Sequence, residues 1–269
     1  MRKLRLISGV ILVFAALAYG SWWYTDQANT ATANSRPTSD VTITASQAEQ
    51  WVAAWYAADL AAAELLTTPP AITGDNAADT RIQQLAERRG YRLQPVAEGE
   101  LVEYEGVELQ PVVIPAWKEL RAIAEAEGLR LGLAAGYSSI ETERQLFLAE
   151  LEARAEALIG RSYTSAQIAS GTADVIINDI LRSQPAPGYS KHHAGYAIDI
   201  SDLSLEGSEL NFRDGPVYAW LAADAYANAR RFGFLPSYPA GGPSQELDRG
   251  EPNEFIWVDI ICINAECSE

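Results

Sequence analysis

The sequence predicts an α+β domain with a small antiparallel sheet flanked by helices. The chain has 269 residues, 48% of them apolar, which is enough to bury the core of one domain or at most two. Segments with helical spacing and short strand-like segments follow one another in mixed order, without an internal repeat. Such mixed order is typical of an α+β fold.

The first 24 residues have the pattern of a signal anchor or a signal peptide. Basic residues at positions 2, 3 and 5 precede an apolar run from Leu6 to Tyr19, and an aromatic group follows at 22–24. The apolar stretch through Tyr24 is close to the roughly 20 residues of a membrane span, and no small-residue cleavage site precedes the aromatic group. We therefore expect an uncleaved single-pass anchor in the cell membrane, with the domain extracytoplasmic; secretion after signal cleavage is the alternative.

Residues 25–45 are rich in Thr, Ala, Asn and Ser and predict a flexible linker. An accessory helix and loop are expected over 46–77, because Ser46 and Glu49 have the spacing of a capping box. One face of this helix carries Val52, Trp55, Tyr56 and Leu60. Its tryptophans are expected in the core, and the main domain is expected over 78–269.

Glycine and proline residues mark the ends of many predicted elements of the main domain. A loop is expected over 67–79, and a turn at 136–139 precedes the second of the helices below. In chain order the sequence predicts a helix from Pro115 to Gly128, a strand at 129–133, a helix over 140–159, a helix over 165–181, a strand over 197–201, a helix from Pro216 to Gly233 and a strand over 255–263.

The charge balance excludes several classes of function. Twenty basic residues stand against 36 acidic ones, a formal charge of -16. A nucleic-acid binder needs a basic face for phosphates, so no nucleic acid or nucleotide is expected as a partner. Anionic lipid is disfavoured for the same reason, which leaves the N-terminal helix as the membrane contact.

The two cysteines of the chain, Cys262 and Cys267, lie near its C-terminus. A four-cysteine zinc site is therefore impossible. In an oxidising compartment the pair could form a disulfide, and the alternative is two reduced thiols.

The chain also has two histidines, and these are adjacent, in the segment S-K-H-H-A-G-Y-A-I-D from Ser190 to Asp199. If the chain folds back at Gly195, His192 and Asp199 converge on a metal, since imidazole nitrogen and carboxylate oxygen are good zinc ligands. Neighbouring residues of an extended segment point to opposite sides. His193 is therefore expected beside the site, partly exposed, and not as a ligand.

This segment resembles the VanY-type D-alanyl-D-alanine carboxypeptidases, LAS-type zinc peptidases that trim the peptide stems of the bacterial cell wall. The fixed positions of the family pattern S-x-H-x-x-G-x-A-x-D are all present: Ser190, His192, Gly195, Ala197 and Asp199. Residues 135–139 stand where the family has S-G-Y-R-S, and residues 251–255 where it has E-P-W-H-[YF]. The resemblance covers about residues 110–260 and implies a VanY-like peptidase fold.

Three positions depart from the family pattern. Glu254 stands in place of the histidine that is the third metal ligand, Ser138 in place of the arginine that binds the substrate carboxylate, and Glu143 in place of a glutamine. Glutamate remains an accepted zinc ligand, so the implied ligands of one divalent metal are His192, Asp199 and Glu254. Zinc is expected; manganese or another hard ion is possible because the ligand set is rich in carboxylates.

The resemblance implies an extracytoplasmic, metal-dependent peptidase acting on peptidoglycan stem or bridge peptides. Glu251, the retained general base, would take a proton from the attacking water and pass it to the leaving amine. Ser138, Glu143 and Ser190 are the candidate substrate-binding residues, although the hydroxyl of Ser190 is expected to bond to the backbone.

Without arginine at position 138 a terminal carboxylate loses a charged partner, and Glu143 would repel it. Cleavage inside a peptide is therefore favoured over carboxypeptidase action. The alternative function is a catalytically degenerate VanY-like domain that binds cell-wall peptide or a protein partner.

Overall fold

The computed structural model describes residues 45–57, 60, 62–205, 212–238 and 251–258. The predicted anchor, nearly all of the predicted linker and the two cysteines lie outside these residues. Across the described part of the chain, no helix combines the length and the apolar character needed to cross a membrane.

A four-stranded antiparallel sheet stands at the centre of the fold, with the strand order β5-β6-β8-β7. Its strands are β5 (Leu131–Ala135), β6 (Ala197–Asp202), β8 (Glu254–Trp257) and β7 (Phe234–Pro236). The register pairs Asp199 with Glu254 and Ala197 with Ile256. Since residues directly opposite in an antiparallel pair share a face, these four side chains lie on one face of the sheet.

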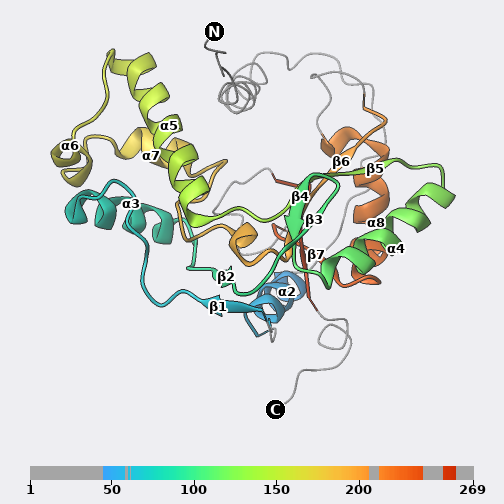
Figure 1. Ribbon diagram of the computed structural model, residues 1–269. Coiled ribbons are helices and arrows are strands. Elements are labelled where there is room, and N and C mark those ends of the chain that lie inside the picture. Colours follow the sequence, from blue (N-terminus) through green and yellow to red (C-terminus); the bar gives the residue numbers. More distant parts are fainter. Residues whose placement is uncertain (1–44, 58–59, 61, 206–211, 239–250, 259–269) are drawn as a thin grey trace, which may run out of the picture. The chain divides into compact units, whose positions relative to one another are not determined.

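Seven described α-helices and two two-stranded antiparallel sheets accompany this sheet (Figure 1). The helices are α2 (Ala45–Ala57), α3 (Asn76–Arg88), α4 (Val113–Ala126), α5 (Ile140–Ile159), α6 (Ser165–Ala169), α7 (Asp174–Ile180) and α8 (Pro216–Arg230). One small sheet pairs β1 (Ala63–Leu65) with β2 (Pro95–Ala97), which α3 separates in the sequence, and the other is a hairpin of β3 (Val102–Tyr104) and β4 (Val107–Leu109). Two 3-10 turns complete the described elements, η1 (Lys191–Ala194) and η2 (Phe212–Asp214).

The buried apolar side chains form two clusters. One joins the sheet to α2, α4 and α8, and the other joins α3, α5, α6 and α7. Together these elements give the mixed helix and small-sheet architecture that the sequence predicts.

Local signals explain where prediction and structure agree or differ along the helices. The predicted helix over 140–159 is confirmed, because Ser139 caps its first turn and Gly160, with a φ of 67°, ends it. The predicted single helix over 165–181 is wrong. Two short helices, α6 and α7, stand there, separated by Gly171 with a φ of 85°.

The predicted loop over 67–79 ends earlier than expected. The Asp75 side chain accepts hydrogen bonds from the backbone N–H groups of Ala77 and Ala78 and so begins α3 at Asn76. The predicted strand over 255–263 is described as β8, and residues beyond 258 lie outside the described part.

Hydrogen bonds through Gln94 connect helix α2 to the loop that precedes η1. Trp51 and Trp55 are buried, as predicted. The Trp55 indole N–H donates to the side-chain oxygen of Gln94 at 3.0 Å, and the Gln94 amide nitrogen donates to the hydroxyl of Tyr56 at 2.7 Å. The backbone N–H of Gln94 in turn donates to the carbonyl of Gly188 at 3.0 Å. The accessory helix thus shares the core of the main domain.

Candidate metal centre

A tight turn presents His192 to the sheet. The Ser190 hydroxyl accepts a hydrogen bond from the backbone N–H of His192 at 3.3 Å and begins η1. Gly195 ends the turn with a φ of 74°, and a Cβ there would lie 2.8 Å from a methyl carbon of Leu101. Glycine is therefore required where the chain folds back into β6, as the sequence predicts.

Three potential ligands converge from η1, β6 and β8. The Nε2 atom of His192 lies 3.5 Å from Oδ1 of Asp199 and 3.6 Å from Oε2 of Glu254. One ligand atom from each of the three residues lies within 4.8 Å of the others. We call these three residues the metal cluster. Its members come from the two segments that the sequence motifs single out, His192 and Asp199 from one and Glu254 from the other.

The second nitrogen of His192 fixes the orientation of its ring. Nδ1 lies 2.6 Å from the carbonyl oxygen of Gly136, so its hydrogen points to that carbonyl and Nε2 faces the two carboxylates. Metal-binding histidines usually have such an outer partner. A Cβ at Gly136 would lie 2.6 Å from the carbonyl oxygen of Glu108, so this position has no room for a side chain. Sequence reasoning missed this contact, although Gly136 lies in the A-G-Y-S-S motif.

The carboxylates change the charge state of the imidazole. Burial lowers the pKa of His192, but Asp199 and Glu254 outweigh it and hold this pKa well above the usual value. Without a metal, the cluster therefore holds a proton on His192 between two carboxylates. A divalent cation has to displace that proton in order to bind.

His193 has a different role from its neighbour. It is buried, so the expectation of partial exposure is wrong. Its Nδ1 lies 2.7 Å from the carbonyl oxygen of Ser138, and its Nε2 accepts the backbone N–H of Gly188 at 3.0 Å. Burial lowers the pKa of His193 to about 4, and the charge of His192 adds to this effect. A neutral His193 therefore joins two loops through backbone hydrogen bonds.

The remaining predicted residues lie around the turn and the sheet. The backbone N–H of Ser138 donates to the carbonyl of His192 at 3.3 Å, so the main chain at this position braces η1. Ser190 is buried, and its hydroxyl bonds to the backbone as expected. Glu143 lies buried in the first turn of α5. Glu251 is half-buried in the turn before β8, where its carbonyl accepts the N–H of Glu254 at 3.4 Å.

The family model for VanY, D-alanyl-D-alanine carboxypeptidase, matches residues 106–257. Because this match spans more than half of the 269 residues, the chain belongs to the VanY D-alanyl-D-alanine carboxypeptidase family. No curated protein sequence matches the chain.

Several solved structures resemble the chain. VanYB in complex with D-alanine-D-alanine is 25% identical, with a TM-score of 0.46, over 61% of this chain and 80% of that one. The vancomycin resistance D,D-pentapeptidase VanY from a VanB-type cassette, in complex with Zn(II), is 26% identical, with a TM-score of 0.43 and the same coverage. The LdcB LD-carboxypeptidase is 24% identical, with a TM-score of 0.42, over 62% of this chain and 67% of that one.

Proposed function

We propose that the chain is an extracytoplasmic, metal-dependent peptidase that acts on peptidoglycan stem or bridge peptides. The observation that carries the proposal is the convergence of His192, Asp199 and Glu254, with the ring of His192 oriented by Gly136. Family membership supports the reaction class, which is hydrolysis of a peptide bond near D-alanine. The basic and apolar N-terminus supports a location outside the cytoplasm.

The three side chains fit one divalent ion. Bonds of about 2.1 Å to an ion space neighbouring tetrahedral ligands by roughly 3.4 Å. The distances from His192 to the two carboxylates, 3.5 and 3.6 Å, match that spacing. One nitrogen and two oxygens suit zinc, while manganese competes because two of the three ligands are carboxylates.

A bound divalent ion would polarise the carbonyl of the substrate peptide and lower the pKa of a water molecule. Glu251 supplies the proton chemistry in this proposal. It lies three residues before Glu254 on the turn that leads into β8, so one short segment carries both the base and a ligand. Glu251 accepts a proton from the attacking water and returns it to the leaving amine.

The test is hydrolysis of defined wall peptides, read by mass spectrometry, with the Glu251→Gln variant beside the wild type. We expect the amide to slow turnover by about 100-fold to 10,000-fold, the usual contribution of a general base, while the bound metal is retained. Glu119→Gln, which changes an exposed carboxylate on α4, serves as the matched control and keeps full activity. Unchanged turnover in Glu251→Gln would refute the role of this base.

A further inference from the structure

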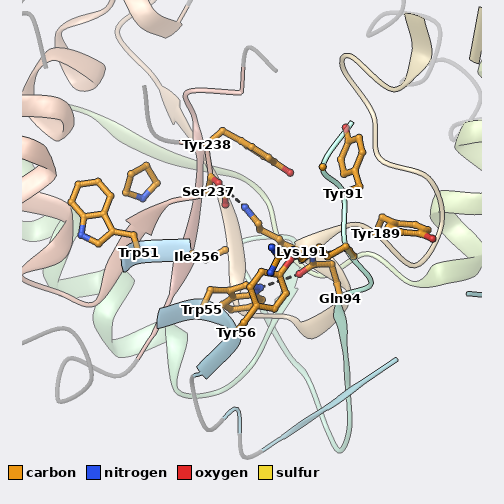
Figure 2. A pocket seen from close by; sticks show the side chains of 13 residues that line it. Trp51, Trp55, Tyr56, Tyr91, Gln94, Tyr189, Lys191, Ser237, Tyr238 and Ile256 are labelled. Carbon is orange, nitrogen blue, oxygen red and sulfur yellow. Dashed lines mark hydrogen bonds between the residues drawn. The ribbon is translucent and has the colours of Figure 1, made fainter. Parts of the chain in front are cut away.

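A pocket of about 180 Å³ is lined by residues of the two elements, η1 and β8, that also carry His192 and Glu254 of the metal cluster (Figure 2). Ile256 lines it and follows Glu254 by two residues on β8, so both side chains belong to the same face of the sheet. Lys191, which directly precedes His192 in η1, lines it from the other side. We call this space the aromatic pocket, because its walls include Trp55, Tyr56, Tyr91, Tyr189 and Tyr238.

Parts of the aromatic pocket come from outside the family match. Trp55 and Tyr56 lie on α2, and Tyr91 lies on the loop that follows α3, whereas the matched region begins at residue 106. The hydrogen bonds of Gln94 to Trp55, Tyr56 and Gly188 hold these pieces together. The pocket therefore combines residues from inside and outside the matched region.

The charge of the aromatic pocket is opposite to that of the chain. Among the described residues, Arg92 and Lys191 line it and no Asp or Glu does, although the chain carries a formal charge of -16. The Lys191 ammonium donates to the carbonyl of Ser237 at 2.6 Å and lies 4.1 Å from the centre of the Tyr238 ring. Figure 2 shows Lys191 reaching between Tyr238 and the Trp55–Tyr56 wall.

The second cation is also held over a ring. The Arg92 guanidinium carbon lies 5.5 Å from the centre of the Tyr56 ring, and no carboxylate of the described residues pairs with this guanidinium. Two cations in a concave site whose described lining includes no carboxylate attract an anionic ligand. A cavity of about 150 Å³ holds a benzene-sized molecule. The part of the ligand that enters the pocket is therefore a small anionic group.

We propose that the aromatic pocket binds a carboxylate of the peptide substrate while the metal cluster engages a nearby peptide bond. This inference rests on the proposed function. Along β8, Ile256 of the pocket follows Glu254 of the cluster by two residues, a rise of about 6.6 Å, which is the length of about two residues of an extended peptide. The carboxylate therefore belongs to a residue beside the scissile bond, either as the C-terminal group or as a side chain.

The test is calorimetric titration of the full-length chain in the presence of a chelator, which prevents turnover. Three probes are compared: acetyl-D-Ala-D-Ala, its C-terminal amide, and acetyl-D-Glu-D-Ala amide. We expect one carboxylate peptide to bind at least about 10-fold more tightly than the amide without a carboxylate, since a charge-assisted bond is worth that much or more. Which of the two peptides gains affinity identifies the source of the carboxylate.

Arg92→Gln is expected to remove this difference, and Arg92→Lys to restore part of it, since lysine keeps the charge but not the forked geometry. Arg88→Gln, which changes an exposed arginine on α3, is the matched control and leaves binding unchanged. Equal or undetectable binding of all three probes, or unaltered binding in Arg92→Gln, overturns the proposal. If Arg92-dependent binding persists in a protein that hydrolyses nothing, only the proposed function fails.

Discussion

The metal cluster and the aromatic pocket both draw residues from η1 and β8 and have opposite charges. Two carboxylates surround His192 in the cluster, whereas the described residues that line the pocket include Arg92 and Lys191 and no carboxylate. Each site therefore attracts a ligand of the other sign, a cation at the cluster and an anion at the pocket. The formal charge of -16 does not reveal this local separation of charge, which comes from the tertiary structure.

The largest effect is expected from breaking the cluster. Glu254→Gln removes one anionic ligand, and we expect zinc affinity to fall by more than about 100-fold, beyond the loss typical of an outer partner. Competition with a chromogenic chelator measures the affinity. Arg92→Gln is the contrasting variant and should leave zinc affinity unchanged. Equal zinc affinity in Glu254→Gln and the wild type would exclude Glu254 as a ligand.

A smaller but clear effect on stability is expected at His193, whose ring joins the loops at Ser138 and Gly188. His193→Ala leaves the carbonyl of Ser138 and the N–H of Gly188 without their partner, and we expect the free energy of unfolding to fall by about 3 kcal/mol. Denaturant unfolding followed by circular dichroism gives the value. His193→Gln, which keeps a donor and an acceptor, should lose less. Equal losses in the two variants would mean that packing, and not these hydrogen bonds, sets the stability.

The pH dependence should separate the two sites. The pKa of His192 is raised without a metal, so below this pKa a proton must leave before a cation binds. Zinc affinity should therefore rise by up to about 10-fold for each pH unit as the pH increases from the usual imidazole pKa toward the raised pKa of His192. Binding of the carboxylate peptides should stay constant over the same interval, because the cations of the aromatic pocket are arginine and lysine and not histidine. If zinc affinity does not change with pH, zinc binding does not displace a proton from His192.

Ionic strength should give the smallest effect. Arg92 is exposed, so raising the salt concentration from about 0.01 M to 0.5 M should weaken carboxylate binding by a few-fold through screening. The buried cluster is screened less, and zinc affinity should change little under the same conditions. Calorimetry in an inert salt measures both. If salt weakens zinc binding more than peptide binding, the description of the cluster as buried and of Arg92 as exposed is wrong.

Local signals explain the parts of the fold and site that the sequence predicts. Helix α5 begins and ends where Ser139 and Gly160 indicate, because caps act within a few residues. The metal cluster combines two short motifs, and the register of β6 with β8 places Asp199 opposite Glu254.

The missed features depend on distant contacts. His193 is buried because Ser138, 55 residues away in the sequence, and Gly188 bind its two nitrogens. The aromatic pocket draws its lining from α2, from the loop after α3, from η1 and from the sheet, and no single motif joins these distant segments. Gly171 divides a stretch whose apolar pattern predicts one helix, because its positive φ is incompatible with helical backbone.

The central claim is that Glu254 completes a metal site with His192 and Asp199. Its most direct test is elemental analysis of the full-length chain, purified without chelator or added metal, beside the His192→Ala variant. We expect close to one divalent ion per chain in the wild type and none in the variant. A wild-type chain that holds no metal, even after incubation with zinc and with manganese, would contradict the account and favour a domain that only binds wall peptides.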